Sequence, residues 1–98
     1  MNMQAMLKQA QAMQKDMLKA KEEIDNTEFV GSSSLVTAKV MGTKEVTSIE
    51  FNLDDDFSID DIDMLQDMIV VAINEANKKV DEATEKKMSK YGNIPGLF

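Results

Sequence analysis

The sequence predicts an α+β fold of order α-β-β-β-α, in which two long helices pack against a three-stranded antiparallel sheet as two layers. Three observations support this prediction. Apolar residues recur at helical spacing at both ends of the chain. In the middle, apolar and polar residues alternate, and Gly/Ser stretches separate the segments there. With 98 residues, the chain is expected to form one domain over residues 1–91, followed by a flexible Gly/Pro tail over 92–98.

The first 26 residues predict an amphipathic helix with a heptad pattern. One set of apolar residues recurs every seven positions, and a second set recurs at the same interval between them. The two sets are Met3, Ala10, Met17 and Ile24, and Met6, Met13 and Ala20. This a/d spacing over about three heptads is typical of a helix that packs along one seam. Asp25, Asn26 and Thr27 are expected to end it.

Three short segments in the middle have strand character: TEFVG, LVTAKVM and KEVTSIEF. Gly31 and the three serines after it separate the first two segments, and Gly42-Thr43 predicts a tight hairpin turn between the second and third. Val36, Ala38 and Val40 share one face because side chains alternate along a strand. An antiparallel meander with one buried face follows.

The run MIVVAI at residues 68–73 fits a buried strand or a buried helix segment, and its flanks favour a helix. A helical stripe extends on both sides of it, and Ser58 with Asp61 resembles a capping box at its start. The stripe consists of Ile62, Leu65, Ile69, Ala72, Ile73, Ala76, Val80 and Ala83.

A second apolar stripe on this helix is expected to be buried against another surface. Met64, Met68 and Val71 lie off the first stripe, whereas a surface helix needs only one. A small domain gains burial by oligomerising, so we expect a homodimer that buries these residues together with Met13 and Met17. Periodicity alone does not say that the second face meets a copy of the same chain. Asn74 and Asn77 fit interface hydrogen bonding and simple exposure equally well.

Composition argues against an enzyme, a metal site and a cofactor. The chain has no Cys and no His, so thiolate chemistry, the usual zinc ligands and the commonest general base are absent. A calcium loop starting at Asp54 would need Gly at its sixth position and Glu at its twelfth, where Ile59 and Leu65 stand. No stretch is long and apolar enough for a bilayer, and the start lacks a signal-peptide pattern. We therefore expect a soluble cytoplasmic protein.

Charge is unevenly distributed within a formal net charge of -7. Residues 45–67 hold nine acids and no base, whereas both ends of the chain are rich in Lys. If the helices pack antiparallel, the start of the first and the end of the second are expected to meet at one tip. The lysines would then gather there, and the acids would lie near the sheet.

Four stretches in order resemble the YbaB/EbfC family of small bacterial nucleoid-associated proteins. They are MLKQAQAMQKDM, VMGT with the later IEF, the segment from Met64 to Ala76, and the ending GNIPGLF. The resemblance implies a homodimer with helical arms projecting like tweezers. It also implies a nucleoid location and DNA binding with little sequence specificity, which alters DNA conformation and influences nucleoid organisation and gene expression without an enzymatic step.

All eleven cations are Lys, which suits contacts to the phosphates of double-stranded DNA more than reading of base edges. The expected DNA-binding residues are Lys8, Lys15, Lys78, Lys79, Lys86, Lys87 and Lys90. The alternative function is a protein-interaction module that docks a DNA repair or replication protein through its acidic or Met-lined surface. Changes at the lysines or at Asp54 to Asp56 would distinguish the two functions.

Overall fold

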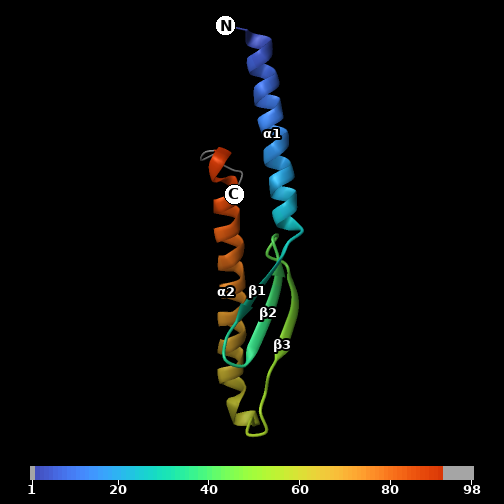
Figure 1. Cartoon of the computed structure of the whole chain (residues 1–98). Coiled ribbons are helices and arrows are strands. Elements are labelled where there is room, and N and C mark those ends of the chain that lie inside the picture. Colours follow the sequence, from blue (N-terminus) through green and yellow to red (C-terminus); the bar gives the residue numbers. More distant parts are fainter. Residues whose placement is uncertain (1, 92–98) are drawn as a thin grey trace.

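The computed structural model describes residues 2–91, and the molecule is elongated, measuring 72 × 19 × 16 Å (Figure 1). The predicted order of elements is confirmed. They are α1 (Met3–Asp25), β1 (Glu28–Ser32), β2 (Val36–Met41), β3 (Val46–Phe51), η1 (Ile59–Asp61), α2 (Ile62–Met88) and η2 (Ser89–Tyr91), of which η1 and η2 are single 3₁₀ turns. The expected flexible tail, 92–98, lies outside the described residues.

The three strands form one antiparallel sheet with β2 in the middle. Val36, Ala38 and Val40 are fully buried, which confirms the predicted inner face of β2. Helix α2 packs against β1 and β2 and makes few contacts with β3 (Figure 1). The inner side of β3 is therefore only partly covered by its own helix.

Gly31 allows β1 to approach α2 closely. A Cβ at this position would lie 2.3 Å from the carbonyl oxygen of Ala72 and 2.3 Å from the backbone nitrogen of Ala76. Both alanines are fully buried. Small residues on both elements thus set a short distance between the helix and the sheet, which any larger side chain would increase.

The hairpin between β2 and β3 turns at Gly42 and Thr43 as predicted, but the left-handed residue of its loop is not the glycine. The loop includes Lys44, whose backbone N–H donates to Met41 O at 2.8 Å and whose φ is 74°. Lys44, and not Gly42, adopts the left-handed conformation that glycine would favour. Gly42 is needed for another reason, because a Cβ there would lie 1.8 Å from the carbonyl oxygen of Ile24.

The start of α2 is organised as the sequence suggests. The backbone N–H of Ser58 donates to the carboxylate of Asp61 at 3.0 Å, and η1 leads directly into α2. Within the run MIVVAI, Ala72 is fully buried, whereas Val70 and Val71 are more than half exposed. One face of this run is therefore covered by the sheet, and the other has no cover within the protomer.

Helix α1 packs antiparallel on α2 through its second half only. Met17, Ala20 and Ile24 form a buried cluster with Met88 of α2, and Phe29 and Tyr91 pack against it. The expectation that the start of α1 meets the end of α2 is wrong. Most of α2 is occupied by the sheet, where its residues from Leu65 to Val80 form two further clusters, so only its last turns reach α1.

The first half of α1 consequently projects past the end of α2 (Figure 1). We call residues 2–16 the arm. Every residue of the arm is exposed, and the first buried residue of the helix is Met17. Asn2 caps the arm, since its side-chain oxygen accepts from the backbone N–H of Gln4 at 3.1 Å.

Candidate nucleic-acid interface

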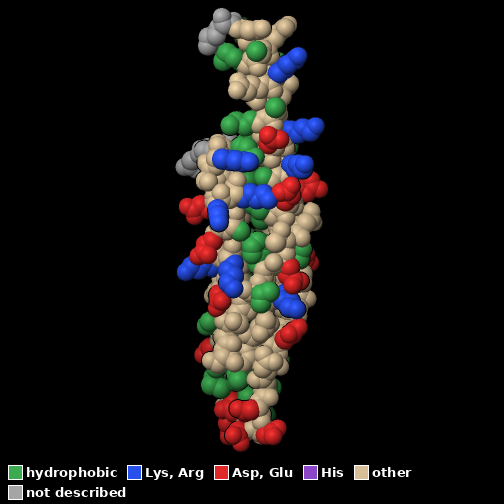
Figure 2. Space-filling model, viewed as in Figure 1, with side chains coloured by type: hydrophobic (Ala, Val, Ile, Leu, Met, Phe, Trp, Pro, Cys, Tyr) green, Lys and Arg blue, Asp and Glu red, His purple; other side chains and the backbone are tan. Residues whose placement is uncertain are grey.

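The two ends of the molecule carry different charges. Acidic side chains gather where β3 leads into α2, and lysines lie along α1 and the second half of α2 (Figure 2). We call the acids from Asp54 to Asp63 the acidic tip. The arm has Lys8 and Lys15 and no acid before Asp16. The acids therefore collect beside the sheet as predicted, at the opposite end from the arm.

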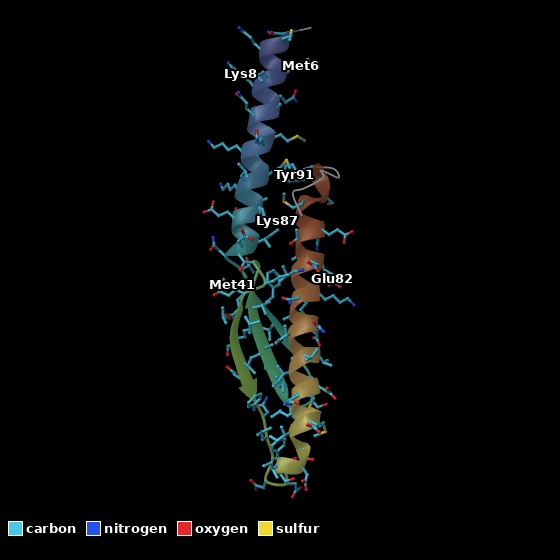
Figure 3. All side chains as sticks on the ribbon, turned by 180° about the vertical axis from the view of Figure 1, so that it is seen from behind. Met6, Lys8, Met41, Glu82, Lys87 and Tyr91 are labelled. Atoms are coloured by element: carbon cyan, nitrogen blue, oxygen red, sulfur yellow. The ribbon has the colours of Figure 1, made fainter. Side chains whose placement is uncertain are left out.

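Four of the seven lysines expected to bind DNA are exposed and form no salt bridge, side-chain hydrogen bond or cation–π contact with the described residues. They are Lys8, Lys15, Lys78 and Lys86. The structure does not bring all seven together. Lys8 lies on the arm, well away from Lys87 at the junction of the two helices (Figure 3).

The other three lysines have partners within the protomer. Lys79 donates to the carbonyl oxygen of Val30 at 2.7 Å and lies 3.6 Å from a carboxylate oxygen of Glu75. Lys90 places its ammonium group 5.0 Å from the centre of the Tyr91 ring. These contacts make the two side chains less available to phosphate than Lys8, Lys15, Lys78 and Lys86.

Lys87 has the closest partner, because its ammonium group donates to a carboxylate oxygen of Glu23 at 2.5 Å. This hydrogen bond, followed by the charge of Lys87, lowers the pKa of Glu23 below its ordinary value. Both side chains are partly exposed, so the pair has the character of a surface ion pair. It joins α1 to α2 beside the Met17 cluster.

The lysines of the arm point away from its apolar residues. With Met3 at heptad position a, Lys8 and Lys15 both occupy position f, which lies opposite the a/d seam. The arm seam consists of Met3, Met6, Ala10 and Met13. Something can thus cover the arm seam and leave both ammonium groups free for an anion.

The acids of the tip take part in local backbone structure. Asp54 accepts from the backbone N–H of Asp56 at 3.1 Å, and Asp61 accepts from Ser58. Within residues 2–91, no three acidic side chains converge in a way that would hold a metal ion. None of the helices in the same range has the length and apolar content needed to cross a membrane.

The residues expected at a dimer interface have different surroundings. Met64 and Val71 are 44% and 53% exposed, so their apolar surface has no cover within the protomer. Met68 is partly buried against the sheet cluster. Met17 is 6% exposed because α2 covers it, and Met13 lies on the arm.

Further apolar surface on β3 was not predicted. Val46 and Phe51 are 42% and 48% exposed, although they pair with the fully buried Val40 and Val36 of β2. The two-residue spacing of Ile49 and Phe51 places both side chains on the same face of β3. It does not reveal that a single helix covers two strands of three.

Asn77 lies between Ile73 and Val80 on the side of α2 that packs against the sheet. Its side-chain oxygen is buried but has no hydrogen-bond partner among the described residues. A buried acceptor without a partner costs free energy. Asn74, in contrast, is exposed.

Comparisons with known proteins identify the family that this chain matches. A family model described as the YbaB/EbfC DNA-binding family matches residues 1–94. A nucleoid-associated protein of Streptococcus suis is 47% identical over 98 residues, covering 97% of this chain and 98% of that protein. A nucleoid-associated protein of Ligilactobacillus salivarius is 42% identical over 100 residues, covering 99% and 95%.

The fold also resembles a crystal structure of an uncharacterized protein from Helicobacter pylori. The TM-score is 0.73 with 19% sequence identity, and the alignment covers 95% of this chain and 99% of that one. At this identity the likeness concerns the fold alone.

Proposed function

The chain belongs to the YbaB/EbfC DNA-binding family, and we propose that it binds duplex DNA through phosphate contacts made by the lysines of the arm and of the second half of α2. Its nucleoid-associated relatives support a role in the nucleoid. Because lysine is a point charge that does not read base edges bidentately, binding has little sequence specificity. The contacts change the conformation of the DNA without an enzymatic step.

The separation of charge along the molecule is the observation that supports this proposal most strongly. A net charge of -7 would by itself oppose DNA binding, but the acids lie at one end of a molecule 72 Å long. Charges in 0.1 M salt are screened over a Debye length of about 10 Å. The DNA near the arm therefore meets Lys8 and Lys15 and is shielded from the acidic tip.

A salt-titrated mobility shift on random-sequence duplex DNA tests the proposal. The test variant changes Lys8, Lys15 and Lys86 to Gln. The control variant changes Lys21, Lys39 and Lys44 to Gln, three lysines that pair with acids within the protomer. Both variants lose three charges, so a difference between them comes from position.

We expect the test variant to bind more weakly and to lose roughly 0.9 from the slope of log K against log salt for each phosphate contact removed. The control variant should keep a slope near that of the original chain. Equal loss in both variants would show that only total charge matters. Unchanged binding in the test variant would contradict the assignment of these lysines.

We also propose that the protein is a homodimer. The half-exposed Met64 and Val71 of α2 and the uncovered side of β3 both support a macromolecular partner on this part of the protomer. A second copy supplies apolar surface of the same kind. Two copies would present two arms, which doubles the number of phosphate contacts available to one duplex.

The acidic tip favours a second candidate function, the docking of a DNA repair or replication protein. Asp54, Asp55 and Asp56 are exposed on one loop and would suit a basic partner surface. Changing these three residues to Asn should abolish such docking and leave DNA binding intact. Loss of DNA binding in this variant would argue against separate roles for the two ends.

A further inference from the structure

Three lysines from two helices lie around one carboxylate where α1 packs on the end of α2. Lys87 donates a hydrogen bond to Glu23 across this junction (Figure 3). Lys19 precedes Glu23 by four residues, about one helical turn, and Lys90 follows Lys87 by three. We call Lys19, Lys87 and Lys90 the junction lysines. Two of them come from sequence positions far from the third, so the docking of α1 on α2 is what brings the three together.

The charges of all three junction lysines act on Glu23. The hydrogen bond from Lys87 lowers the pKa of Glu23 most, followed by the charge of Lys87, and the charges of Lys19 and Lys90 lower it further. Lys19 is exposed and forms no salt bridge with the described residues. With three cations to one carboxylate, this group keeps an excess of positive charge even while Glu23 is in place.

The junction lysines continue a row of lysines that begins on the arm. Lys8 and Lys15 lie on one side of α1, seven residues apart, and Lys19 follows Lys15 by four. At 3.6 residues and 5.4 Å per turn, Lys19 is roughly 6 Å further along the helix than Lys15 and about 40° around its axis. The same step again leads to Glu23, which contacts Lys87 of α2. A duplex bound along the arm therefore meets the junction next.

The contact between Glu23 and Lys87 can open without loss of the fold. Both side chains are partly exposed, and an ion pair at such a position contributes little to stability. The two helices are held together by the buried cluster around Met88, which does not include the ion pair. A phosphate of DNA can replace the carboxylate as the partner of Lys87, and the release of counterions from the DNA favours this exchange.

We propose that Lys19 and Lys87 form a second phosphate-binding site of the DNA interface, at the junction of the two helices, and that Glu23 restrains this site by occupying Lys87. Lys90 adds a third positive charge beside them. The inference rests on the proposed function, because duplex DNA supplies the anion. It adds Lys19 to the interface and gives Glu23 the part of a competitor that a DNA phosphate must displace.

Three single variants of the full chain test the restraint, each titrated onto a labelled random-sequence duplex at several salt concentrations. Glu23→Gln frees Lys87 and keeps its charge. Glu22→Gln is the matched control, because it removes the same charge from the same turn and Glu22 forms no salt bridge with the described residues. Lys87→Gln breaks the same contact but removes the cation, so it reveals any effect of loosening α1 from α2.

We expect Glu23→Gln to raise DNA affinity in 0.1 M salt by roughly threefold or more, and Glu22→Gln by less than about twofold. The slope of log K against log salt should steepen by roughly 0.9 in Glu23→Gln if one phosphate contact is gained. Lys87→Gln should bind no more tightly than the original chain. Equal gains in the two glutamate variants would overturn the proposal, because only total charge would then matter. A gain in Lys87→Gln would overturn it in favour of loosened helices.

Lys19→Gln tests the part of the site on α1, and Lys21→Gln is its control. Lys21 is two residues later on the same helix and pairs with Asp25. We expect Lys19→Gln to weaken binding by roughly threefold or more and Lys21→Gln by less than about twofold. The same loss in both variants would overturn the assignment of Lys19 to the site.

The experiment separates the junction site from the proposed function. Salt-sensitive binding by the original chain, with equal effects of Glu23→Gln and Glu22→Gln, would overturn the junction site alone. Absence of DNA binding by the original chain and by Glu23→Gln alike would overturn the proposed function and the junction site together.

Discussion

Gly31 of β1 lies against the backbone of Ala76 in α2, so closely that a Cβ on Gly31 would be 2.3 Å from the Ala76 nitrogen. Gly31→Ala must therefore push the helix away from the sheet. We expect it to lower the free energy of unfolding by about 3 kcal/mol, the upper end of the cost of overpacking a core. Urea unfolding followed by circular dichroism measures the change.

Ser32→Ala is the matched control for Gly31→Ala, because Ser32 is the next residue of the same strand and is exposed. Its effect should stay within about 0.5 kcal/mol. If both substitutions have the same small effect, the sheet and the helix are not held at the distance that the structure shows.

Met88→Ala tests how the arm is anchored. Met88 is 1% exposed and is the residue of α2 that packs with Met17, Ala20 and Ile24. We expect a loss of about 2 to 4 kcal/mol, from lost burial and the cavity left behind. Leu18→Ala, at a 59% exposed position of α1, should change stability by less than about 0.5 kcal/mol. Equal effects would show that α1 does not pack on α2 through this cluster.

The fold was predictable from the sequence in its elements and less so in their placement. Alternation of Val36, Ala38 and Val40 identified the inner face of β2, since burial on one face imposes a period of two. The docking position of α1 was not predictable. Heptad spacing gives the seam of a helix but not which part of that seam another helix covers.

The candidate interface was predictable to a similar extent. The helical periodicity places Lys8 and Lys15 opposite the arm seam, and this needs only the sequence. The pairing of Lys87 with Glu23 joins residues 64 positions apart and depends on how α1 docks on α2. The left-handed Lys44 was missed because Gly42, two residues earlier, offered the expected turn signal.

The Glu23 and Lys87 pair predicts a pH dependence of stability. Since Lys87 lowers the pKa of Glu23 in the folded state, the unfolded chain binds more protons than the folded chain around pH 4. The stabilisation is present above the unfolded pKa of about 4.3 and is lost as pH falls through the lower folded pKa. Glu23→Gln should remove this component, whereas Glu22→Gln on the same turn should keep it.

Unfolding midpoints measured between pH 3 and pH 7 for the original chain and both variants give the comparison. Plotted against pH, the unfolding midpoint of Glu23→Gln should approach that of the original chain near pH 3 and differ from it near pH 7. Curves that run parallel at every pH would contradict a role for the pair.

Val71→Asp and Phe51→Asp test the proposed homodimer. Each places a charge on apolar surface that the protomer leaves about half exposed, so burying it in an interface becomes costly. We expect analytical ultracentrifugation to give a mass near 11.0 kDa for both variants and twice that for the original chain. Gln66→Asp adds the same charge to another exposed position of α2 and should remain dimeric. A dimeric Val71→Asp would exclude this part of α2 from the interface.

The acidic tip gives a prediction about ionic strength. The loop between β3 and α2, which contains Asp54, Asp55 and Asp56, lies at the opposite end of the 72 Å molecule from the arm (Figure 1). In 0.1 M salt the Debye length of about 10 Å screens them from DNA bound at the arm. Changing all three to Asn should therefore alter DNA affinity by less than about twofold in that salt.

At 0.01 M salt the Debye length increases to about 30 Å, and repulsion from the tip reaches further along the molecule. The same triple variant should then bind DNA more tightly than the original chain. A mobility shift at both salt concentrations measures the two affinities. Strong tightening already at 0.1 M would place the bound DNA near the tip, and the lysines of the arm would then not be the main phosphate contacts.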